Sequence, residues 1–224
     1  MKLALQTLAT AVASVVFFGA LLFLPAGTLD YWQAWVFIAT FTAATLVPSV
    51  YLAKRDPAAL RRRMKAGPTA ETRPVQKAVM VGTLVSVVAA VVLSAFDHRF
   101  GWSSVPTPVV VFGDVLVAAG LGIAQLVVIQ NSWAAATITI EDGQRLVSTG
   151  LYGLVRHPMY TGGLVMMAGM PLALDSYWGL VPVAFAIPLL AVRIVDEEAM
   201  LRADLAGYGQ YTQRVRYRMI PYMW

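Results

Sequence analysis

The chain has 224 residues, of which 58% are hydrophobic and 13% are charged, and its net charge is +5. A soluble domain carries about 25% charged residues, so this composition argues against a soluble protein and indicates several membrane-spanning helices. Cysteine is absent, which excludes disulfides and thiolate metal sites, and with two histidines we expect no metal site. The basic residues lie between apolar runs, where anionic lipid explains them better than nucleic acid.

The first two apolar runs predict two membrane spans. Lys2 precedes the run at 3–24, which reaches the roughly 20 residues that a spanning helix needs. A cleaved signal peptide would have a shorter apolar region, so we expect a retained first helix. After a short turn, the run at 31–53 predicts the second span.

The segment 54–77 is the most basic loop of the chain, which predicts a cytosolic position. It includes three consecutive arginines at 61–63. We interpret these as a topology signal and a lipid contact rather than as a nucleic-acid site.

Two more spans are expected at 75–96 and 109–130. The apolar segments 160–174 and 179–195 are shorter or interrupted by proline, which fits either a tight helix pair or a re-entrant hairpin. Placing both termini and the basic segments in the cytosol leaves Arg99 as the one basic residue of the outer loops.

The sequence therefore predicts an all-α, polytopic membrane helix bundle of five to six transmembrane helices with both termini cytosolic. Alternating β-branched residues at 137–147 predict a small cytosolic hairpin. Tyr208 and Tyr211, three apart, are expected on one face of a C-terminal helix, as packing residues or cofactor contacts. With no internal repeat, we expect one membrane domain over 1–224, with N-terminal helices at 1–107 and a core at 108–224.

The stretch 149–163 concentrates polar residues between two apolar segments. Pro158 suits the first turn of a new helix, so Arg156 and His157 are expected at the start of a helix that enters the bilayer. The backbone N–H groups and the positive dipole end of that helix would face the cytosol.

A family resemblance emerges from several motifs taken together. Arg156-His157-Pro-Met-Tyr160-Thr-Gly is followed by Glu197-Glu198, by the tyrosine pair and by Arg-Tyr-Arg-Met-Ile-Pro at 216–221. This combination resembles the isoprenylcysteine carboxyl methyltransferase and phospholipid N-methyltransferase superfamily, integral membrane enzymes that use S-adenosylmethionine. The resemblance runs from about residue 120 to the C-terminus, and the segment 205–209, ahead of the tyrosines, departs from the family pattern.

The resemblance implies a cofactor site in the C-terminal half. The implied S-adenosylmethionine-binding residues are Gly120, Gly122, Arg156, His157, Tyr160, Glu197 and Glu198. Arg156 and Glu198 are the expected catalytic residues, and no metal is expected. Carboxylates, cations and aromatic faces are also what the ammonium, carboxylate and sulfonium groups of this cofactor need.

Structural explanations for these residues remain open. Arg156 and His157 could anchor a helix end at lipid headgroups, and Gly120 and Gly122 could allow close helix packing. The glutamates could form a solvated helix end, with Glu198 paired to Arg202 and Glu197 beneath Arg193. Since neighbouring helical residues point about 100° apart, the glutamates cannot share one role, and we expect Glu198 to face the pocket.

The function implied by the resemblance is S-adenosylmethionine-dependent methyl transfer to a lipidic acceptor, either an isoprenylcysteine-type carboxylate or a phospholipid amine. We expect it at the cytosolic face of a bacterial-type inner membrane. One alternative is an NADPH-dependent membrane reductase of the steroid and sterol reductase type. Another is a non-enzymatic transporter or scaffold, which would place facing charges near the middle of the bilayer. The acceptor, the oligomeric state and the role of the N-terminal helices stay open.

Overall fold

The computed structural model describes residues 2–64, 71, 73–134 and 143–224, and in this part of the chain the regular structure is entirely helical. The elements are α1 (Lys2–Ala26), α2 (Trp32–Arg55), α3 (Pro57–Met64), α4 (Pro74–Phe100), α5 (Thr107–Gln130), η1 (Gly150–Gly153), α6 (Pro158–Ala173), α7 (Leu180–Asp204) and α8 (Tyr208–Arg214). The all-α prediction is confirmed, including the C-terminal helix. The hairpin expected at 137–147 lies largely outside the described residues.

Among the described residues, four helices are long and apolar enough to cross a membrane: α1 from Leu5 onward, α2, α4 and α5. They coincide with the four N-terminal spans expected from the sequence. Helix α6 has only 16 residues, and α7 carries charged residues throughout its last third. The number of crossings beyond four, and the side of the membrane on which each end lies, stay predictions.

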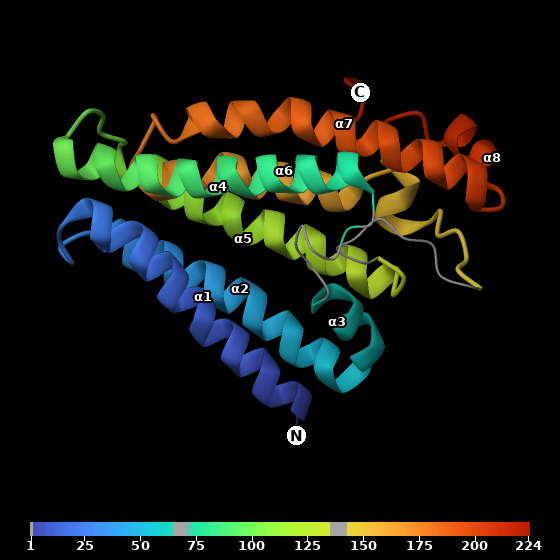
Figure 1. The fold of residues 1–224 in the computed structure, drawn as a ribbon, viewed down its shortest axis with the longest axis horizontal. Coiled ribbons are helices and arrows are strands. Elements are labelled where there is room, and N and C mark those ends of the chain that lie inside the picture. Colours follow the sequence, from blue (N-terminus) through green and yellow to red (C-terminus); the bar gives the residue numbers. More distant parts are fainter. Residues whose placement is uncertain (1, 65–70, 72, 135–142) are drawn as a thin grey trace.

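The helices pack side by side, with α5 along α6 and α4 along α7, while α1 and α2 form a hairpin that diverges from α4 and α7 toward α3 (Figure 1). Small residues set the close approach of α5 and α6. A Cβ atom added at Gly120 would lie 2.4 Å from the carbonyl oxygen of Gly162. This contact can form only because neither residue has a side chain.

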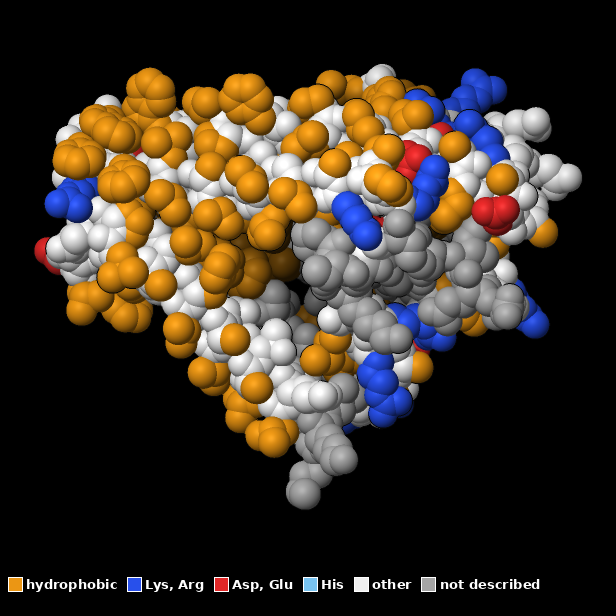
Figure 2. Space-filling view, viewed as in Figure 1, with side chains coloured by type: hydrophobic (Ala, Val, Ile, Leu, Met, Phe, Trp, Pro, Cys, Tyr) orange, Lys and Arg blue, Asp and Glu red, His pale blue; other side chains and the backbone are white. Residues whose placement is uncertain are grey.

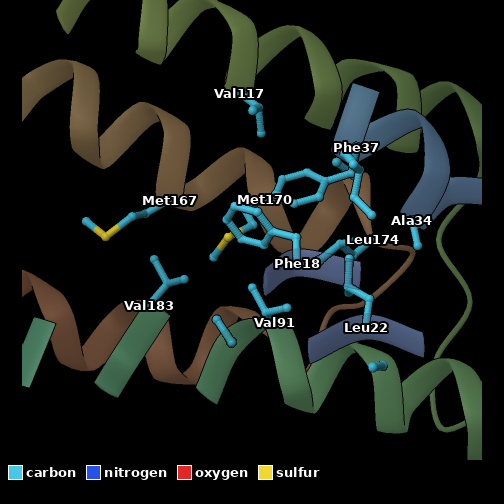
Figure 3. Packing of buried hydrophobic residues seen from close by; sticks show 14 of the residues in the cluster. Phe18, Leu22, Ala34, Phe37, Val91, Val117, Met167, Met170, Leu174 and Val183 are labelled. Carbon is cyan, nitrogen blue, oxygen red and sulfur yellow. The ribbon is translucent and has the colours of Figure 1, made fainter. Parts of the chain in front are cut away.

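A continuous apolar core joins the N-terminal hairpin to the C-terminal helices. Phe18 and Leu22 of α1 and Phe37 of α2 pack with Met170 and Leu174 at the end of α6 (Figure 3). The N-terminal helices thus pack into the same core as the C-terminal helices. The division into one domain stays a prediction.

Polar groups tie the helix ends together at the end of the molecule away from α8. Asp97 at the end of α4 is fully buried and accepts hydrogen bonds from Ser103 and, at 2.6 Å, from Ser176. Asp175 accepts a hydrogen bond from Gln33 of α2 at 2.9 Å. These bonds fix the register of α2, α4, α6 and α7. The start of α6 and the end of α7 therefore lie at the same end of the molecule.

Charge is unevenly distributed over the molecule. Figure 2 shows hydrophobic side chains over most of one face, whereas Lys and Arg side chains gather toward the end at which α7 finishes and α8 lies. Asp114 is a charged residue inside α5, away from the ends of that helix. It is buried, and its carboxylate oxygens have no hydrogen-bond partner among the described residues.

Candidate active site

Two segments about 40 residues apart in the sequence form the site: the start of α6 and the end of α7 (Figure 1). Pro158 is the first residue of α6, as predicted, and Arg156 and His157 immediately precede it. The backbone N–H groups of Arg156 and His157 donate to the carbonyl oxygens of Tyr217 and Arg218, at 2.9 and 2.8 Å. The C-terminal tail therefore holds the start of α6 in place.

Glu198 lies at the centre of a cluster of cationic side chains. Its side chain is 1% exposed, and its carboxylate is contacted by Arg156 at 2.9 Å, His157 Nε2 at 3.3 Å, Arg202 at 3.3 Å and Arg218 at 3.2 Å. Burial alone would raise the pKa of this carboxyl, but hydrogen bonds from His157 and Arg218 and the charge of Arg156 lower it to about 2. Glu198 is therefore an ionised anchor for Arg156 and His157.

Glu197 has a different environment from Glu198. Its carboxylate is 22% exposed, lines a cavity, and accepts a 2.7 Å hydrogen bond from the Tyr160 hydroxyl. Glu198 does not line this cavity. The glutamates point apart as expected, but the one that faces the cavity is Glu197 rather than Glu198. Their separate roles in binding stay predictions.

A second polar network holds Tyr160 and, through its hydroxyl, Glu197. The Tyr160 hydroxyl accepts a hydrogen bond from Arg193 Nε at 2.9 Å, and Arg193 also donates to Glu71 at 2.8 Å and to Gln76 at 2.9 Å. The sequence suggested a direct Glu197–Arg193 pair, whereas the structure places the Tyr160 hydroxyl between them. Because Glu71 comes from the basic 54–77 segment, that segment contributes to the site.

The cavity opens to solvent and has a solvent-accessible volume of about 120 Å³. Its walls combine aromatic rings with a carboxylate, including Trp133, Tyr152, Tyr160, Glu197 and Tyr208. This mixture suits a ligand that has both a flat or apolar part and charged groups.

The tyrosine pair of α8 has divided roles. Tyr208 and Tyr211 are both buried, with ring centroids 5.7 Å apart, as the shared face predicted. The Tyr211 hydroxyl donates to the backbone carbonyl of Tyr152 at 2.7 Å, which fixes η1. The Tyr208 hydroxyl is buried without a hydrogen-bond partner in the described part of the chain, and burial raises its pKa, so it stays protonated. Tyr208 is thus the hydroxyl of the pair that is free to bind a ligand.

The structure brings together five of the seven residues expected to bind the cofactor: Arg156, His157, Tyr160, Glu197 and Glu198. Gly120 lies instead at the α5–α6 contact, and a Cβ atom at Gly122 would meet nothing within 4 Å. Neither glycine lines the cavity. Close packing therefore accounts for Gly120, and cofactor contact by either glycine stays a prediction.

Sequence reasoning missed Glu71 and the structural role of Arg193. An arginine in the apolar body of a predicted span was an available signal, because a charge there needs a partner. The partner itself could not be identified, since Glu71 lies more than 120 residues away in a loop.

Comparison with known proteins bears on the same region. Residues 109–205 match the family model described as phospholipid methyltransferase. A segment of 91 residues, 39% of this chain, is 34% identical to the Delta(14)-sterol reductase TM7SF2 of Mus musculus and covers 22% of that protein. A longer segment of 147 residues, 62% of this chain, is 25% identical to Protein-S-isoprenylcysteine O-methyltransferase B of Arabidopsis thaliana and covers 69% of it. The chain thus spans about a fifth of the reductase. The predicted family resemblance is confirmed.

Proposed function

We propose, from the match of residues 109–205 to the phospholipid methyltransferase family model, that the protein is an S-adenosylmethionine-dependent methyltransferase acting on a lipidic acceptor. The observation that carries the proposal is the cavity at the junction of α6, α7 and α8. The family match includes all of α6 and all of α7, which supply Tyr160 and Glu197 to that cavity.

The residues around the cavity fit the proposed cofactor. Glu197 offers a carboxylate to an ammonium group or to ribose hydroxyls, and Tyr152 and Trp133 offer aromatic faces near a positive sulfur. The Tyr208 hydroxyl and Arg156 Nε are buried donors that lack hydrogen-bond partners among the described residues. Unpaired buried donors are costly, so a ligand that accepts from them is favoured. When bound, the cofactor supplies an electrophilic methyl group.

Catalysis would then depend mainly on positioning, and the chain divides that task between two networks. Glu198 holds Arg156 and His157 at the start of α6, so we assign Glu198 as a positioning residue. Glu71 and Arg193 hold Tyr160, which in turn orients Glu197 toward the cavity. A carboxylate acceptor needs no base, whereas an amine acceptor must lose a proton, for which Glu197 is the exposed carboxylate of the site.

The setting of this site supports a lipid acceptor. Four candidate spans make the protein an integral membrane protein, and the cavity lies at the end where charged side chains gather. The positive-inside rule favours the cytosolic face of a bacterial-type inner membrane for that end. The lipid would approach between helices and the cofactor from the aqueous side.

A second candidate function is reduction with NADPH, favoured by the match to a sterol reductase. The two functions differ in the ligand that the cavity binds. Calorimetric titration of the purified protein with S-adenosylhomocysteine and, separately, with NADPH distinguishes them. We expect saturable binding of S-adenosylhomocysteine, whereas binding of NADPH alone would replace our proposal with the reductase.

The same titration tests the cavity itself. Glu197→Gln removes a charged hydrogen-bonding group worth about 1.5–3 kcal/mol, so we expect affinity for S-adenosylhomocysteine to fall by about tenfold or more. Asp204→Asn is the matched control, because Asp204 is an exposed acid of the same helix that does not line the cavity. Equal affinities for the two variants would place the ligand elsewhere.

A further inference from the structure

The short helix α3 brings a cationic side chain to the edge of the cavity. Arg63 Nη1 lies 3.2 Å from the sulfur of Met159, and Met159 lines the cavity. Helix α3 is fixed there, because Leu60 packs with Leu52 and Val128 and the Asp56 carboxylate accepts from the backbone N–H of Ala59 at 3.0 Å. The position of Arg63 is therefore set by packing.

The half-buried Arg63 differs from the buried arginines in having no anionic partner among the described residues. Arg156 is paired with Glu198 at 2.9 Å and Arg193 with Glu71 at 2.8 Å. In the ranges that the structure describes, no carboxylate lies within ion-pair distance of Arg63, whose hydrogen-bond acceptor is a thioether. A thioether is a weak acceptor, so it compensates little of the cost of removing a guanidinium from water.

The neighbouring arginines 61 and 62 do not share the position of Arg63 at the cavity edge. Arg61 is exposed. Arg62 stacks over Trp133, 4.7 Å from the ring centroid, and donates to the Ser132 carbonyl oxygen at 3.2 Å. A topology signal needs only the number of positive charges on one side of the membrane. It does not explain why Arg63 points at the cavity edge.

We propose that Arg63 binds the oxyanion of a ligand in the cavity, a carboxylate or a phosphate; this proposal rests on the function proposed above. Glu197 then offers a negative charge to a positive or hydroxyl group. Arg63, at the cavity edge, adds to the positive charge of Arg145, Arg156 and Arg193, which line the cavity. The oxyanion has two possible sources, the amino-acid carboxylate of the cofactor and the headgroup of a lipid.

The test compares Arg63→Gln with Arg61→Gln, which removes the same charge from the exposed side of α3. Calorimetry first measures S-adenosylhomocysteine and its decarboxylated analogue. A second series, without cofactor, measures short-chain dihexanoyl phosphatidic acid and uncharged dihexanoylglycerol. Thermal unfolding establishes that both variants are folded, and Arg63→Lys tests whether a point charge restores binding.

If the oxyanion belongs to the cofactor, Arg63→Gln weakens S-adenosylhomocysteine binding by about tenfold or more and leaves the decarboxylated analogue unchanged. If it belongs to a lipid headgroup, the same loss occurs for phosphatidic acid and not for the uncharged lipid. Unchanged affinity in both series, or equal losses in Arg61→Gln, overturns the proposal. Failure of the wild-type protein to bind S-adenosylhomocysteine refutes the proposed function instead, and the lipid series still reports on Arg63.

Discussion

Replacing Glu198 with glutamine should strongly destabilise the protein. The substitution keeps the shape of the side chain but removes the negative charge that compensates Arg156, whose side chain is 7% exposed. Arg202 and Arg218 have side chains that are 50% and 26% exposed, so water can solvate them when the charge is lost. Breaking one partner of a buried ion pair costs about 3–5 kcal/mol, and we expect Glu198→Gln to fall in this range.

Unfolding of the purified protein in detergent, followed by circular dichroism, measures this loss. Arg202→Gln is the control, because it removes an exposed i,i+4 pair and should cost no more than about 0.5 kcal/mol. Acid gives an independent check. Since folding lowers the pKa of Glu198 from 4.5 to about 2, its stabilisation is complete above pH 4.5 and is lost as the pH falls toward 2. Glu198→Gln should lack this component of the acid sensitivity.

Two outcomes would refute this reasoning. A loss below about 1 kcal/mol would show that Glu198 does not compensate a buried charge. An unchanged acid profile would show that its pKa is not lowered by folding. Comparison with Glu197→Gln adds a further check, because that change should weaken ligand binding while leaving most of the stability intact.

Three further predictions concern other contacts. Glu71→Gln should lower the methyl transfer rate more than the affinity for S-adenosylhomocysteine, because it loosens Arg193; equal losses in rate and affinity would argue against a positioning role. Gly120→Ala should lower the free energy of unfolding by about 1–3 kcal/mol, because its Cβ would clash with α6. Gly122→Ala in the same helix, where an added Cβ meets nothing within 4 Å, should not destabilise the protein. Tyr208→Phe should weaken S-adenosylhomocysteine binding, whereas Tyr211→Phe should chiefly lower the melting temperature, and the reverse result would exchange their roles.

Local signals explain why much of the architecture was predictable. The apolar runs at 31–53 and 109–130 are long enough to form helices whatever their partners are, because unpaired backbone groups are costly in a membrane. Pro158 marked the start of α6 because proline fits the first helical turn and cannot continue a helix. The meeting of Arg156 with Glu198 followed from the motif combination and from the return of α7 to the same end.

What the sequence by itself determined was therefore the helical spans and the set of polar residues that gather at one end of the bundle. Only the tertiary structure decided which glutamate faces the cavity, because a helix rotates neighbouring side chains by about 100° and packing alone fixes its rotation. Only the tertiary structure brought Glu71 to Arg193 and Arg63 to Met159, since such contacts join residues far apart in the chain. Such ion pairs form only when folding brings two distant side chains together. A local sequence pattern does not indicate which side chains will meet.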